Sequence, residues 1–195
     1  MAARGPRKTP LSRSSRNIIA SLAISADGFI ARPDGGVEWL DRPRPKGDYD
    51  MGEFYRSIDT ILMGRKTYDF AVDYQKSGKA KSVFDPKVKN YLFSRTIAAA
   101  DVVSPVELVS EPVKAFAQEL RAQPGKNIWM MGGGGLIASF LDAGEMDEFI
   151  LSVIPVFIGE GIPLIAPRHR KVSLKLLSSK AFSDGVVQLH YRVGT

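Results

Sequence analysis

The sequence predicts an α/β protein, a three-layer sandwich whose central sheet is covered by helices on both faces. Short apolar runs, typical of strands buried on both faces, alternate along the chain with segments of helical periodicity. The last run instead alternates apolar with polar residues, which is typical of a half-exposed antiparallel strand. We therefore expect a mixed, mostly parallel sheet that ends in a C-terminal antiparallel hairpin.

Strands and helices alternate through the first half of the chain. Ile18–Ile24 is an apolar run broken only by Ser21, and a loop over residues 25–47, rich in Gly, Pro and Asp, follows it. Loops of that length in compact domains are usually functional or mobile. The next expected elements are a helix over Asp48–Ser57, a strand over Ile58–Met63, a helix over Arg65–Val72 and a strand over Val88–Phe93.

The second half continues the alternation. Ser110 is expected to cap a helix that ends near Ala122, before the breaker Pro124-Gly125. A strand over Ile128–Met131, four glycines and a helix stopped by Gly144 follow. The last expected elements are a strand over Phe149–Ile154 and a hairpin of Val172–Leu177 and Val186–Val193 around the turn Ser183-Asp184-Gly185.

Length and composition limit the class of protein. A chain of 195 residues, 44% of them hydrophobic, is long enough for one domain with a full core. The absence of cysteine excludes disulfides, a thiolate nucleophile and cysteine metal sites. It fits a reducing compartment, and we expect a cytoplasmic protein. No run of 18 apolar residues is present, so we expect no membrane span.

The net charge of +6 comes mostly from residues 1–16, which contain five basic residues and no acidic one. Residues 17–195 carry 22 basic and 21 acidic residues and form the predicted single domain. A polar segment with two prolines cannot bury enough surface to fold alone, so we expect a disordered basic tail. A transit segment and a nucleic-acid contact are the alternatives. Because the near-neutral domain offers no basic face, we expect no nucleic-acid partner.

Four consecutive glycines, Gly132 to Gly135, lie between a predicted buried strand and a predicted helix. Without Cβ atoms they let backbone N–H groups approach a ligand, and a helix N-terminus suits a pyrophosphate. The spacing Gly133-x-Gly135-x-x-Ala138 formally matches the dinucleotide fingerprint. No acidic residue ends the next strand at Ile154-Pro155, so we reject the standard Rossmann interpretation. A plain tight turn is the alternative.

Two cationic turns also follow buried strands. In Gly64-Arg65-Lys66-Thr67, two cations at a helix N-terminus oppose the helix dipole, at a cost that a bound phosphate offsets. Ser94-Arg95-Thr96 adds an arginine suited to bidentate phosphate contact. All three features end strands at the edge where α/β sheets bind ligands, so together they predict a ligand with several phosphates. Solvated surface turns are the alternative.

Six short motifs occur in an order that resembles one known family. They are Ser25–Ala31, Glu38-Trp39-Leu40, Met63–Tyr68, Phe93–Thr96, Gly132–Gly135 and Val153–Gly159. The set resembles the dihydrofolate-reductase-like superfamily, and within it the C-terminal reductase domain of bifunctional riboflavin-biosynthesis enzymes, over residues 17–194. The resemblance implies a homodimeric reductase that uses NADPH to transfer a hydride to a small-molecule, pteridine-like or pyrimidine-like substrate.

The resemblance also implies a cofactor site. Arg65, Lys66 and Thr67 are expected to hold the pyrophosphate, and Ser94 and Arg95 the adenosine 2′-phosphate. Backbone groups at the end of the first strand are expected to contact the nicotinamide amide. The implied cofactor-binding residues are Ala23, Ile24, Gly64, Arg65, Lys66, Thr67, Ser94, Arg95, Gly132, Gly133, Gly134, Gly135 and Leu136.

Fewer signals point to the substrate side. One proton must accompany the hydride, and the candidate catalytic residues are Asp48, on the predicted helix, and Asp27, in an Asp-Gly pair. A capping role for Asp48 and a turn role for Asp27 are the alternatives. Asp27, Trp39, Asp50 and Phe54 are the expected substrate contacts, although Trp39 alternatively anchors the long loop.

No metal site is expected, because the two histidines, His169 and His190, lack a paired metal-ligand spacing. His190 is expected on the solvent-facing side of its strand. Two rival functions remain at this stage. One is a true dihydrofolate reductase, and the other is a non-catalytic NADP-binding dimer.

Overall fold

The computed structural model describes residues 16–42, 49–78 and 80–194. The strands are β1 (Ile18–Ser25), β2 (Phe29–Ala31), β3 (Ile58–Gly64), β4 (Lys89–Phe93), β5 (Val106–Val109), β6 (Asn127–Gly132), β7 (Glu148–Ile154), β8 (Ile162–Pro163), β9 (Leu174–Ala181) and β10 (Val187–Val193). The helices are α1 (Met51–Arg56), α2 (Arg65–Lys76), α3 (Val113–Ala122) and α4 (Gly134–Asp142), with 3-10 turns at Glu38–Leu40 and Ala99–Asp101.

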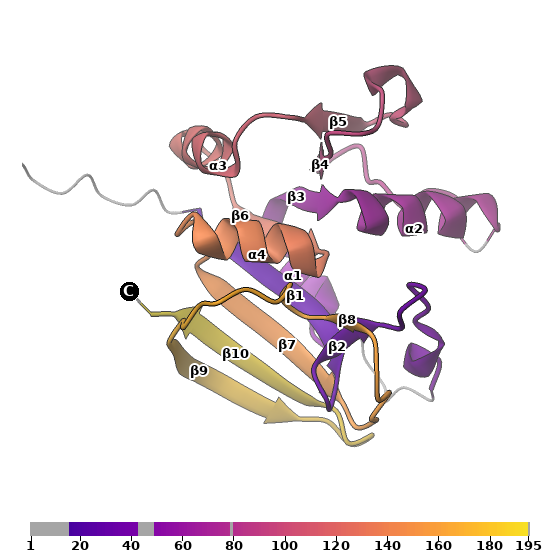
Figure 1. The fold of residues 1–195 in the computed structure, drawn as a ribbon, viewed down its shortest axis with the longest axis vertical. Coiled ribbons are helices and arrows are strands. Elements are labelled where there is room, and N and C mark those ends of the chain that lie inside the picture. The colour runs from indigo at the N-terminus through magenta and orange to yellow at the C-terminus, as the bar shows by residue number, and fades with distance from the viewer. Residues whose placement is uncertain (1–15, 43–48, 79, 195) are drawn as a thin grey trace, which may run out of the picture.

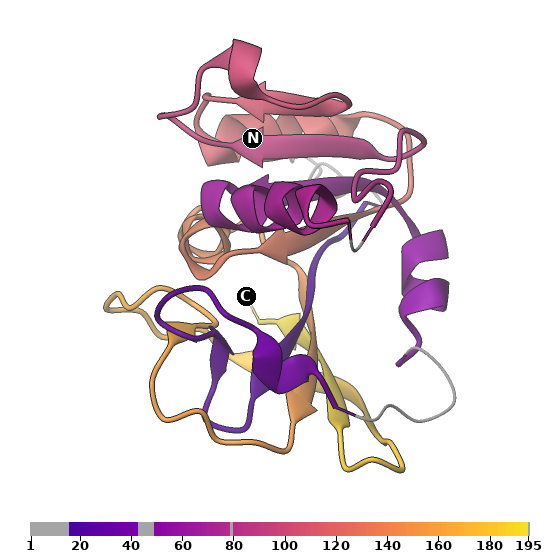
Figure 2. The same cartoon turned by 90° about the vertical axis from the view of Figure 1, so that its right-hand side faces the viewer.

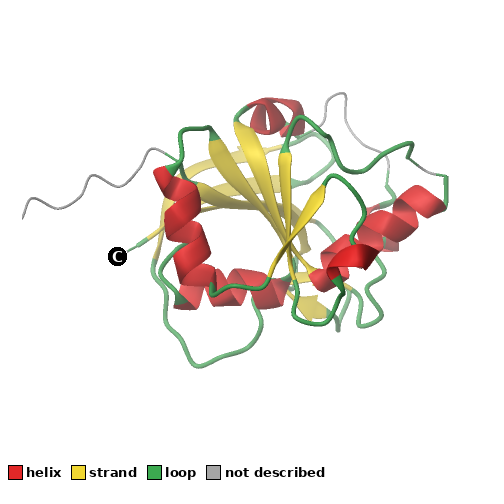
Figure 3. Ribbon diagram, turned by 90° about the horizontal axis from the view of Figure 1, so that it is seen from above, coloured by secondary structure: helices red, strands yellow, loops and turns green. Residues whose placement is uncertain are grey.

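The main sheet has eight strands in the order β5-β4-β3-β6-β1-β7-β10-β9 (Figure 1). The first six strands in this order, from β5 to β7, run parallel to one another, whereas β10 pairs antiparallel with both β7 and β9. A small second sheet pairs β2 with β8. Helices lie on both faces of the main sheet (Figure 3). The predicted class, a mixed and mostly parallel sheet with a C-terminal antiparallel hairpin, is confirmed.

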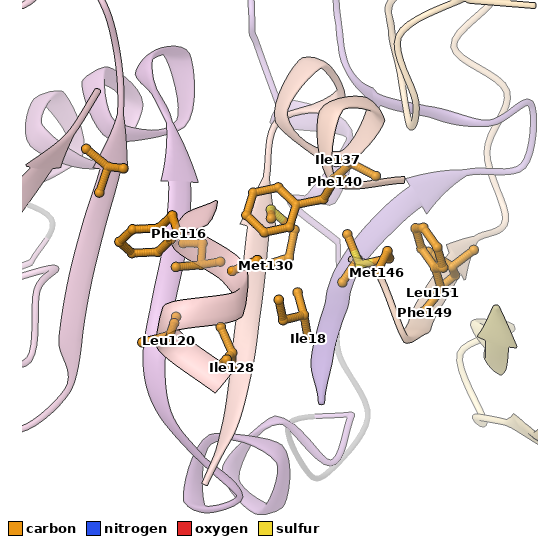
Figure 4. Close-up of a cluster of buried hydrophobic side chains, with 14 of the residues drawn as sticks. Ile18, Phe116, Leu120, Ile128, Met130, Ile137, Phe140, Met146, Phe149 and Leu151 are labelled. Atoms are coloured by element: carbon orange, nitrogen blue, oxygen red, sulfur yellow. The ribbon is translucent and has the colours of Figure 1, made fainter. Parts of the chain in front are cut away.

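Alternation along the central strands produces the two helix layers. On β6, Ile128 and Met130 are fully buried in the core under α3 and α4, where Phe140 also packs (Figure 4). Trp129 and Met131 point to the other face and pack in the core that includes residues of α1 and α2. Successive side chains of a strand point to opposite faces, so one apolar strand supplies both cores.

A third, smaller core ties the segment after β2 to the sheet. Trp39 packs there with Ile154, Ile158 and Val186, and its side chain is 9% exposed. Trp39 therefore anchors the long loop, which is the alternative that the sequence left open.

Several element boundaries differ from those expected. The short strands β2, β5 and β8 were not anticipated, because two to four residues give too little alternation to recognise. The helix α2 continues to Lys76, four residues beyond the expected Val72. Pro112, rather than Ser110, is the N-cap of α3, and no side chain caps that helix. The strand β9 begins at Leu174 and continues to Ala181, beyond the expected Leu177.

The expected tail boundary is one residue too late. Arg16 is only 3% exposed and forms an ion pair with Asp59. Its guanidinium also donates to the carbonyl of Lys126 at 2.7 Å and to Oγ1 of Thr60 at 2.8 Å. Arg16 therefore belongs to the folded domain, while the expectation of a disordered tail concerns residues 1–15, which lie outside the described residues. In the described ranges, no helix is long and apolar enough to cross a membrane.

Candidate functional site

A cavity of about 790 Å³ opens where β3 and β6 end, which is within the usual size range of a small-molecule site. Eight of the expected cofactor residues line it: Gly64, Arg65, Lys66, Thr67, Gly133, Gly134, Gly135 and Leu136. The other lining residues are Ile30, Ala31, Pro33, Asp34, Gly35, Val37, Asp69, Phe70, Asp73 and Ile162. Figure 2 shows the segment that follows β2 below α2, with α4 beside them.

Parallel strand pairing brings two of the three predicted phosphate features together. The strands β3 and β6 are neighbours, and Met63 is opposite Gly132 in their register. Each strand leads directly into a helix, with Gly64 as the N-cap of α2 and Gly133 as the N-cap of α4. Neither helix has a side-chain cap. The first N–H groups of a helix have no partner one turn earlier within it, so the starts of both helices direct backbone donors toward one cavity; in α4 the N–H of Leu136 already donates to the carbonyl of Gly133 at 3.0 Å.

The four glycines from Gly132 to Gly135 have different surroundings and different roles. Gly132 has φ +119°, a conformation that side chains rarely adopt, and its peptide bond to Gly133 is cis. A Cβ on Gly134 would lie 2.5 Å from the carbonyl oxygen of Pro163, so this glycine permits close backbone packing. A Cβ on Gly135 would meet nothing within 4 Å. Gly132 and Gly134 are therefore required by the backbone conformation and packing of the fold, whereas Gly135 leaves open space at the cavity.

Both positively and negatively charged side chains line the cavity. Arg65 donates through Nε to both carboxylate oxygens of Asp69, at 2.7 and 2.8 Å, and both side chains are partly exposed. Lys66 adds a second cation beside Thr67. Asp34 and Asp73 add two further carboxylates. Positive charge is thus concentrated at the start of α2, where the free N–H groups also lie.

The third predicted phosphate feature lies beside the cavity and does not line it. Phe93 is opposite Gly64 in the register of β4 and β3, so Ser94 follows at the same edge of the sheet, one strand further out. Its hydroxyl accepts the backbone N–H groups of Thr96 and Ile97 at 3.3 and 3.4 Å. The placement of Ser94 and Arg95 near a phosphate stays a prediction.

The sheet opens between β1 and β6 at the same edge. The two strands pair only over Ile18–Ala20, and Trp129 Nε1 donates to the carbonyl of Ser21 at 2.8 Å just beyond that pairing. Backbone groups of alternate residues face opposite neighbours along a strand. The N–H and C=O of Ala23 therefore face the opening, whereas those of Ile24 face β7.

Asp27 holds two chain segments together. Its carboxylate accepts the hydroxyl of Ser25 at 2.5 Å and the backbone N–H groups of Ile158 and Gly159, both on Oδ2, at 3.1 and 2.8 Å. The hydrogen bond from Ser25 has the largest effect and lowers the pKa of Asp27; burial opposes it, and the backbone N–H groups of Gly159 and Ile158 add to the lowering, so the pKa lies below its ordinary value. Asp27 does not line the cavity.

The other expected substrate residues lie outside the cavity lining. Asp50 forms an ion pair with Lys180 at 2.5 Å and so fastens the start of α1 to β9. Phe54 packs edge-to-face on Trp129, with ring centroids 5.6 Å apart. Trp39 is in the third core, as described above. Asp48 lies outside the described residues, so its catalytic role stays a prediction.

Sequence reasoning missed the cavity residues that lie further along α2 and in the segment after β2. Phe70 follows Lys66 by four residues and Asp73 follows Phe70 by three, which places all three on one face of α2. That spacing was available as a signal. Residues 33–37 belong to the long loop expected to be functional or mobile, but a loop sequence does not say which of its residues face a ligand.

The remaining titratable groups do not form a metal site. In residues 16–42, 49–78 and 80–194, no three His, Cys, Asp or Glu side chains are arranged to hold a metal ion. His190, expected to face solvent, is partly buried, with Nε2 2.9 Å from the carboxylate of the buried Glu148.

The mixed, mostly parallel eight-stranded sheet with its C-terminal antiparallel pair gives the chain a dihydrofolate-reductase-like fold. The model of the RibD C-terminal domain matches residues 16–188, and the chain belongs to that family. The resemblance found in the six sequence motifs is thereby confirmed. YyaP of Bacillus subtilis (strain 168), an uncharacterized protein, is 36% identical over 189 residues, covering 90% of this chain and 94% of YyaP.

Solved structures share the fold. A putative riboflavin biosynthesis protein from Shewanella sp. PV-4 has a TM-score of 0.79 at 24% identity, over 92% of this chain and 99% of that one. The diaminohydroxyphosphoribosylaminopyrimidine deaminase/5-amino-6-(5-phosphoribosylamino)uracil reductase of Thermotoga maritima has a TM-score of 0.65 at 18% identity, over 91% of this chain and 56% of that one.

Proposed function

We propose that this protein is an NADPH-dependent reductase of a small heterocyclic substrate. The observation that carries the proposal is the meeting of two helix N-termini, both capped by glycine, at one cavity that also contains Arg65 and Lys66. Free N–H donors and cations are the groups that bind a pyrophosphate. Membership of the RibD C-terminal domain family supports a reductase rather than another phosphate-binding protein.

The residues present fit such a cofactor. Gly135 leaves room for a ligand against the start of α4, and Thr67 adds a hydroxyl. The backbone N–H and C=O of Ala23 face the opening between β1 and β6 and suit a carboxamide, which needs one acceptor and one donor. When bound, NADPH supplies a hydride, and one proton from a side chain or water completes the reduction of a double bond in the substrate.

The chain's own residues position the reactants and exclude water. Asp27 holds the segment around Ile158 against the end of β1, next to the proposed nicotinamide position. Because its lowered pKa keeps it ionised at neutral pH, we assign Asp27 a positioning role and not that of proton donor. Asp48 or an ordered water is the proposed source of the proton.

Cofactor titration tests the proposal. We expect NADPH to bind more tightly than NADH and to stabilise the protein by about 2.7 kcal/mol at 100 times its Kd. Arg65→Ala and Arg95→Ala should each weaken NADPH binding about tenfold, since a hydrogen bond to a charged group contributes about 1.5–3 kcal/mol. If both variants stay within twofold of wild type, or NADH binds equally well, the cofactor assignment is wrong. NADPH binding without oxidation across pteridine and pyrimidine acceptors would instead support the non-catalytic dimer.

We also propose that the protein is a homodimer. All eight residues of β9 are exposed, and no helix lies over β9 or β10 in Figures 1 and 2. Cross-strand pairing places Leu174, Leu176 and Val187 on one face of this hairpin, and they are 45%, 51% and 37% exposed. Lys175 and Lys180 point to the other face, so two copies of the uncharged face can meet around a two-fold axis without like-charge repulsion.

Light scattering after size-exclusion chromatography tests the dimer. The wild type is expected at twice the 21.4 kDa chain mass, and Leu176→Lys at the chain mass. Lys175→Ala, on the opposite face, is the matched control and should remain dimeric. A wild type that is monomeric at every concentration contradicts the proposal.

A further inference from the structure

The opening between β1 and β6, where the nicotinamide is proposed to bind, has two different sides. On the side of α3 and α4 it borders the main core, in which Ile24 and Met130 are buried. Ala23 and Trp129 precede these two residues and point to the opposite side, because successive residues of a strand alternate between the two faces. That is the side of α1, whose Phe54 packs on Trp129, and Ala23 is only partly buried there. A hydride acceptor must therefore approach the nicotinamide from the α1 side.

A row of paired residues crosses the sheet on this side. Ala23 is opposite Ser152 of β7 in the strand register, and Ser152 is opposite Gln188 of β10. Residues opposite each other on neighbouring strands point to the same face, and the strands are about 4.8 Å apart, so Ser152 lies one strand beyond Ala23. All three side chains are partly exposed. We call Ser152 and Gln188 the polar pair.

The carboxamide of Gln188 is held in one orientation. Its Nε2 donates to the carbonyl of Tyr49 at 3.1 Å and to Oγ of Ser152 at 3.4 Å. Oε1 is therefore directed away from these two acceptors. Among the residues that the structure describes, Oε1 accepts from no donor and the hydroxyl of Ser152 donates to no acceptor. The polar pair thus offers one acceptor and one donor beside each other.

The helix α1 spans the row. Just before α1, the carbonyl of Tyr49 binds Gln188 of β10, and within α1, Phe54 packs edge-to-face on Trp129 of β6. Since β1 and β7 lie between β6 and β10 in the sheet, the segment from Tyr49 to Phe54 crosses both strands. A ring that packs on Ala23 therefore lies between the polar pair and the aromatic rings of Phe54 and Trp129, next to the opening.

We infer that Gln188 selects, and Ser152 anchors, the lactam edge of the substrate ring, which is a C=O next to a ring N–H. This inference rests on the proposed function, in which the nicotinamide of NADPH occupies the opening. The hydroxyl of Ser152 donates to the ring C=O, and Oε1 of Gln188 accepts the ring N–H. A ring with an amino group and a bare nitrogen at the same places sets an acceptor against the acceptor of Gln188 and is rejected.

Two pteridines that differ at this edge test the inference. Pterin presents a C=O next to a ring N–H, whereas 2,4-diaminopteridine presents an amino group next to a bare ring nitrogen. Each is titrated, at a pH where both rings are uncharged, into protein saturated with NADP⁺, which cannot reduce them. We expect pterin to bind at least about tenfold more tightly, because a mismatched buried polar group loses its hydrogen bond as well as its water.

Substitutions of the polar pair separate recognition from a structural role. Gln188→Leu should reduce the preference for pterin to about twofold or less. Gln188→Glu should reverse the preference, because a carboxylate accepts from the amino group and from a protonated ring nitrogen. Loss of the contact with Tyr49 alone does not produce a reversal. Ser152→Ala should weaken both compounds about fivefold and leave the preference, since a hydroxyl can either donate or accept.

Ser178→Ala is the matched control for Ser152→Ala. Ser178 is opposite His190 on β10 and points to the same face of the sheet, but it lies outside the row. This variant should bind both compounds as the wild type does. Weakening by Ser178→Ala equal to that by Ser152→Ala would contradict the role of Ser152.

The remaining outcomes are also decisive. Equal affinities in the wild type, or tighter binding of 2,4-diaminopteridine, overturn the inference, and so does a preference for pterin that survives Gln188→Leu. Binding of neither compound to the NADP⁺-loaded protein also overturns it, but leaves the proposed cofactor site intact. Failure of NADP⁺ itself to bind refutes the proposed function, and the inference with it.

Discussion

The two ends of the parallel strands are built differently. At the amino ends, charged groups are buried and paired with one another: Arg121, about one-tenth exposed, forms an ion pair with Asp147 at 2.5 Å, and the same carboxylate accepts the N–H of Ile18 at 2.7 Å. At the carboxyl ends, the helices α2 and α4 start without side-chain caps, and Arg65 and Asp69 are exposed.

The difference separates stability from binding. At the amino ends of the strands, Arg16, just before β1, pairs with Asp59 of β3, and Arg121 of α3 pairs with Asp147, just before β7. At the carboxyl ends the helices α2 and α4 have no side-chain caps and the charged groups lie near water, which stabilises the fold little but leaves these groups accessible to a ligand. Substitutions at one end should therefore change stability without changing ligand affinity, and those at the other end should do the reverse.

Arg16→Ala is the strongest test of this separation. It removes a buried guanidinium and leaves Asp59 and the carbonyls of Leu120 and Lys126 without that donor. We expect a loss of about 3 kcal/mol in the free energy of unfolding, measured with urea, since breaking a buried ion pair costs about 3–5 kcal/mol and Asp59 is partly exposed. NADPH affinity should stay within twofold. Arg65→Ala is the matched control, with nearly unchanged stability and weaker binding.

Gly134→Ala should have the next largest effect. It tests whether Gly134 is needed for the packing of the fold. The added methyl would lie 2.5 Å from the carbonyl oxygen of Pro163 and 3.1 Å from that of Leu164, so the backbone must move. We expect a loss of about 2 kcal/mol in the free energy of unfolding, within the usual cost of overpacking. An unchanged unfolding curve would show that the segment after β8 yields without cost.

The sequence was sufficient for the features that depend on local pattern. Alternation and apolar runs located the eleven longer strands and helices of the described residues, and parallel strands necessarily bring Gly64 and Gly133 to one edge. The sequence was insufficient where pairing between distant segments decides. The pairing of Phe29 with Pro163 across 134 positions creates β2 and β8, and two or three residues carry no recognisable period.

Side-chain direction set the other limit. Asp27 and Trp39 are polar or aromatic residues in a loop, and such residues contact either a ligand or the protein itself. Only the fold shows that Asp27 accepts backbone N–H groups of residues 158 and 159 and that Trp39 packs against Ile154. The cavity lining formed by Phe70 and Asp73 is a different case, because their helical spacing from Lys66 was available in the sequence.

Gly135→Ala tests the binding end of the comparison and should have a smaller effect than the previous two. Its methyl meets nothing within 4 Å, so the fold accommodates it, and alanine favours a helix over glycine by about 1 kcal/mol. We expect stability equal to or above that of wild type and NADPH binding weakened about tenfold, because the methyl occupies space at the proposed pyrophosphate. Unchanged NADPH affinity, measured by calorimetry, would place the cofactor elsewhere.

Asp27→Asn should produce the smallest change. It tests whether one residue can contribute both to stability and to turnover. Its pKa is lowered in the folded state, so ionised Asp27 stabilises the fold above the ordinary carboxyl value of 3.8, and this contribution is lost as pH falls through the lowered pKa. The stability gap between wild type and variant, measured by urea unfolding from pH 7 downward, should stay constant above 3.8 and narrow as the pH falls below it.

Asp184→Asn is the matched control for Asp27→Asn. The pKa of Asp184 is also lowered, first of all by the hydroxyl of Tyr49, so the same closing gap is expected there. Asp184 does not line the cavity, so this variant should not change turnover. Asp27→Asn should slow turnover without removing an ionisation from its profile between pH 5 and 8, because a positioning carboxylate is ionised throughout that range. Loss of such an ionisation in the variant would instead identify Asp27 as the proton donor and contradict its positioning role.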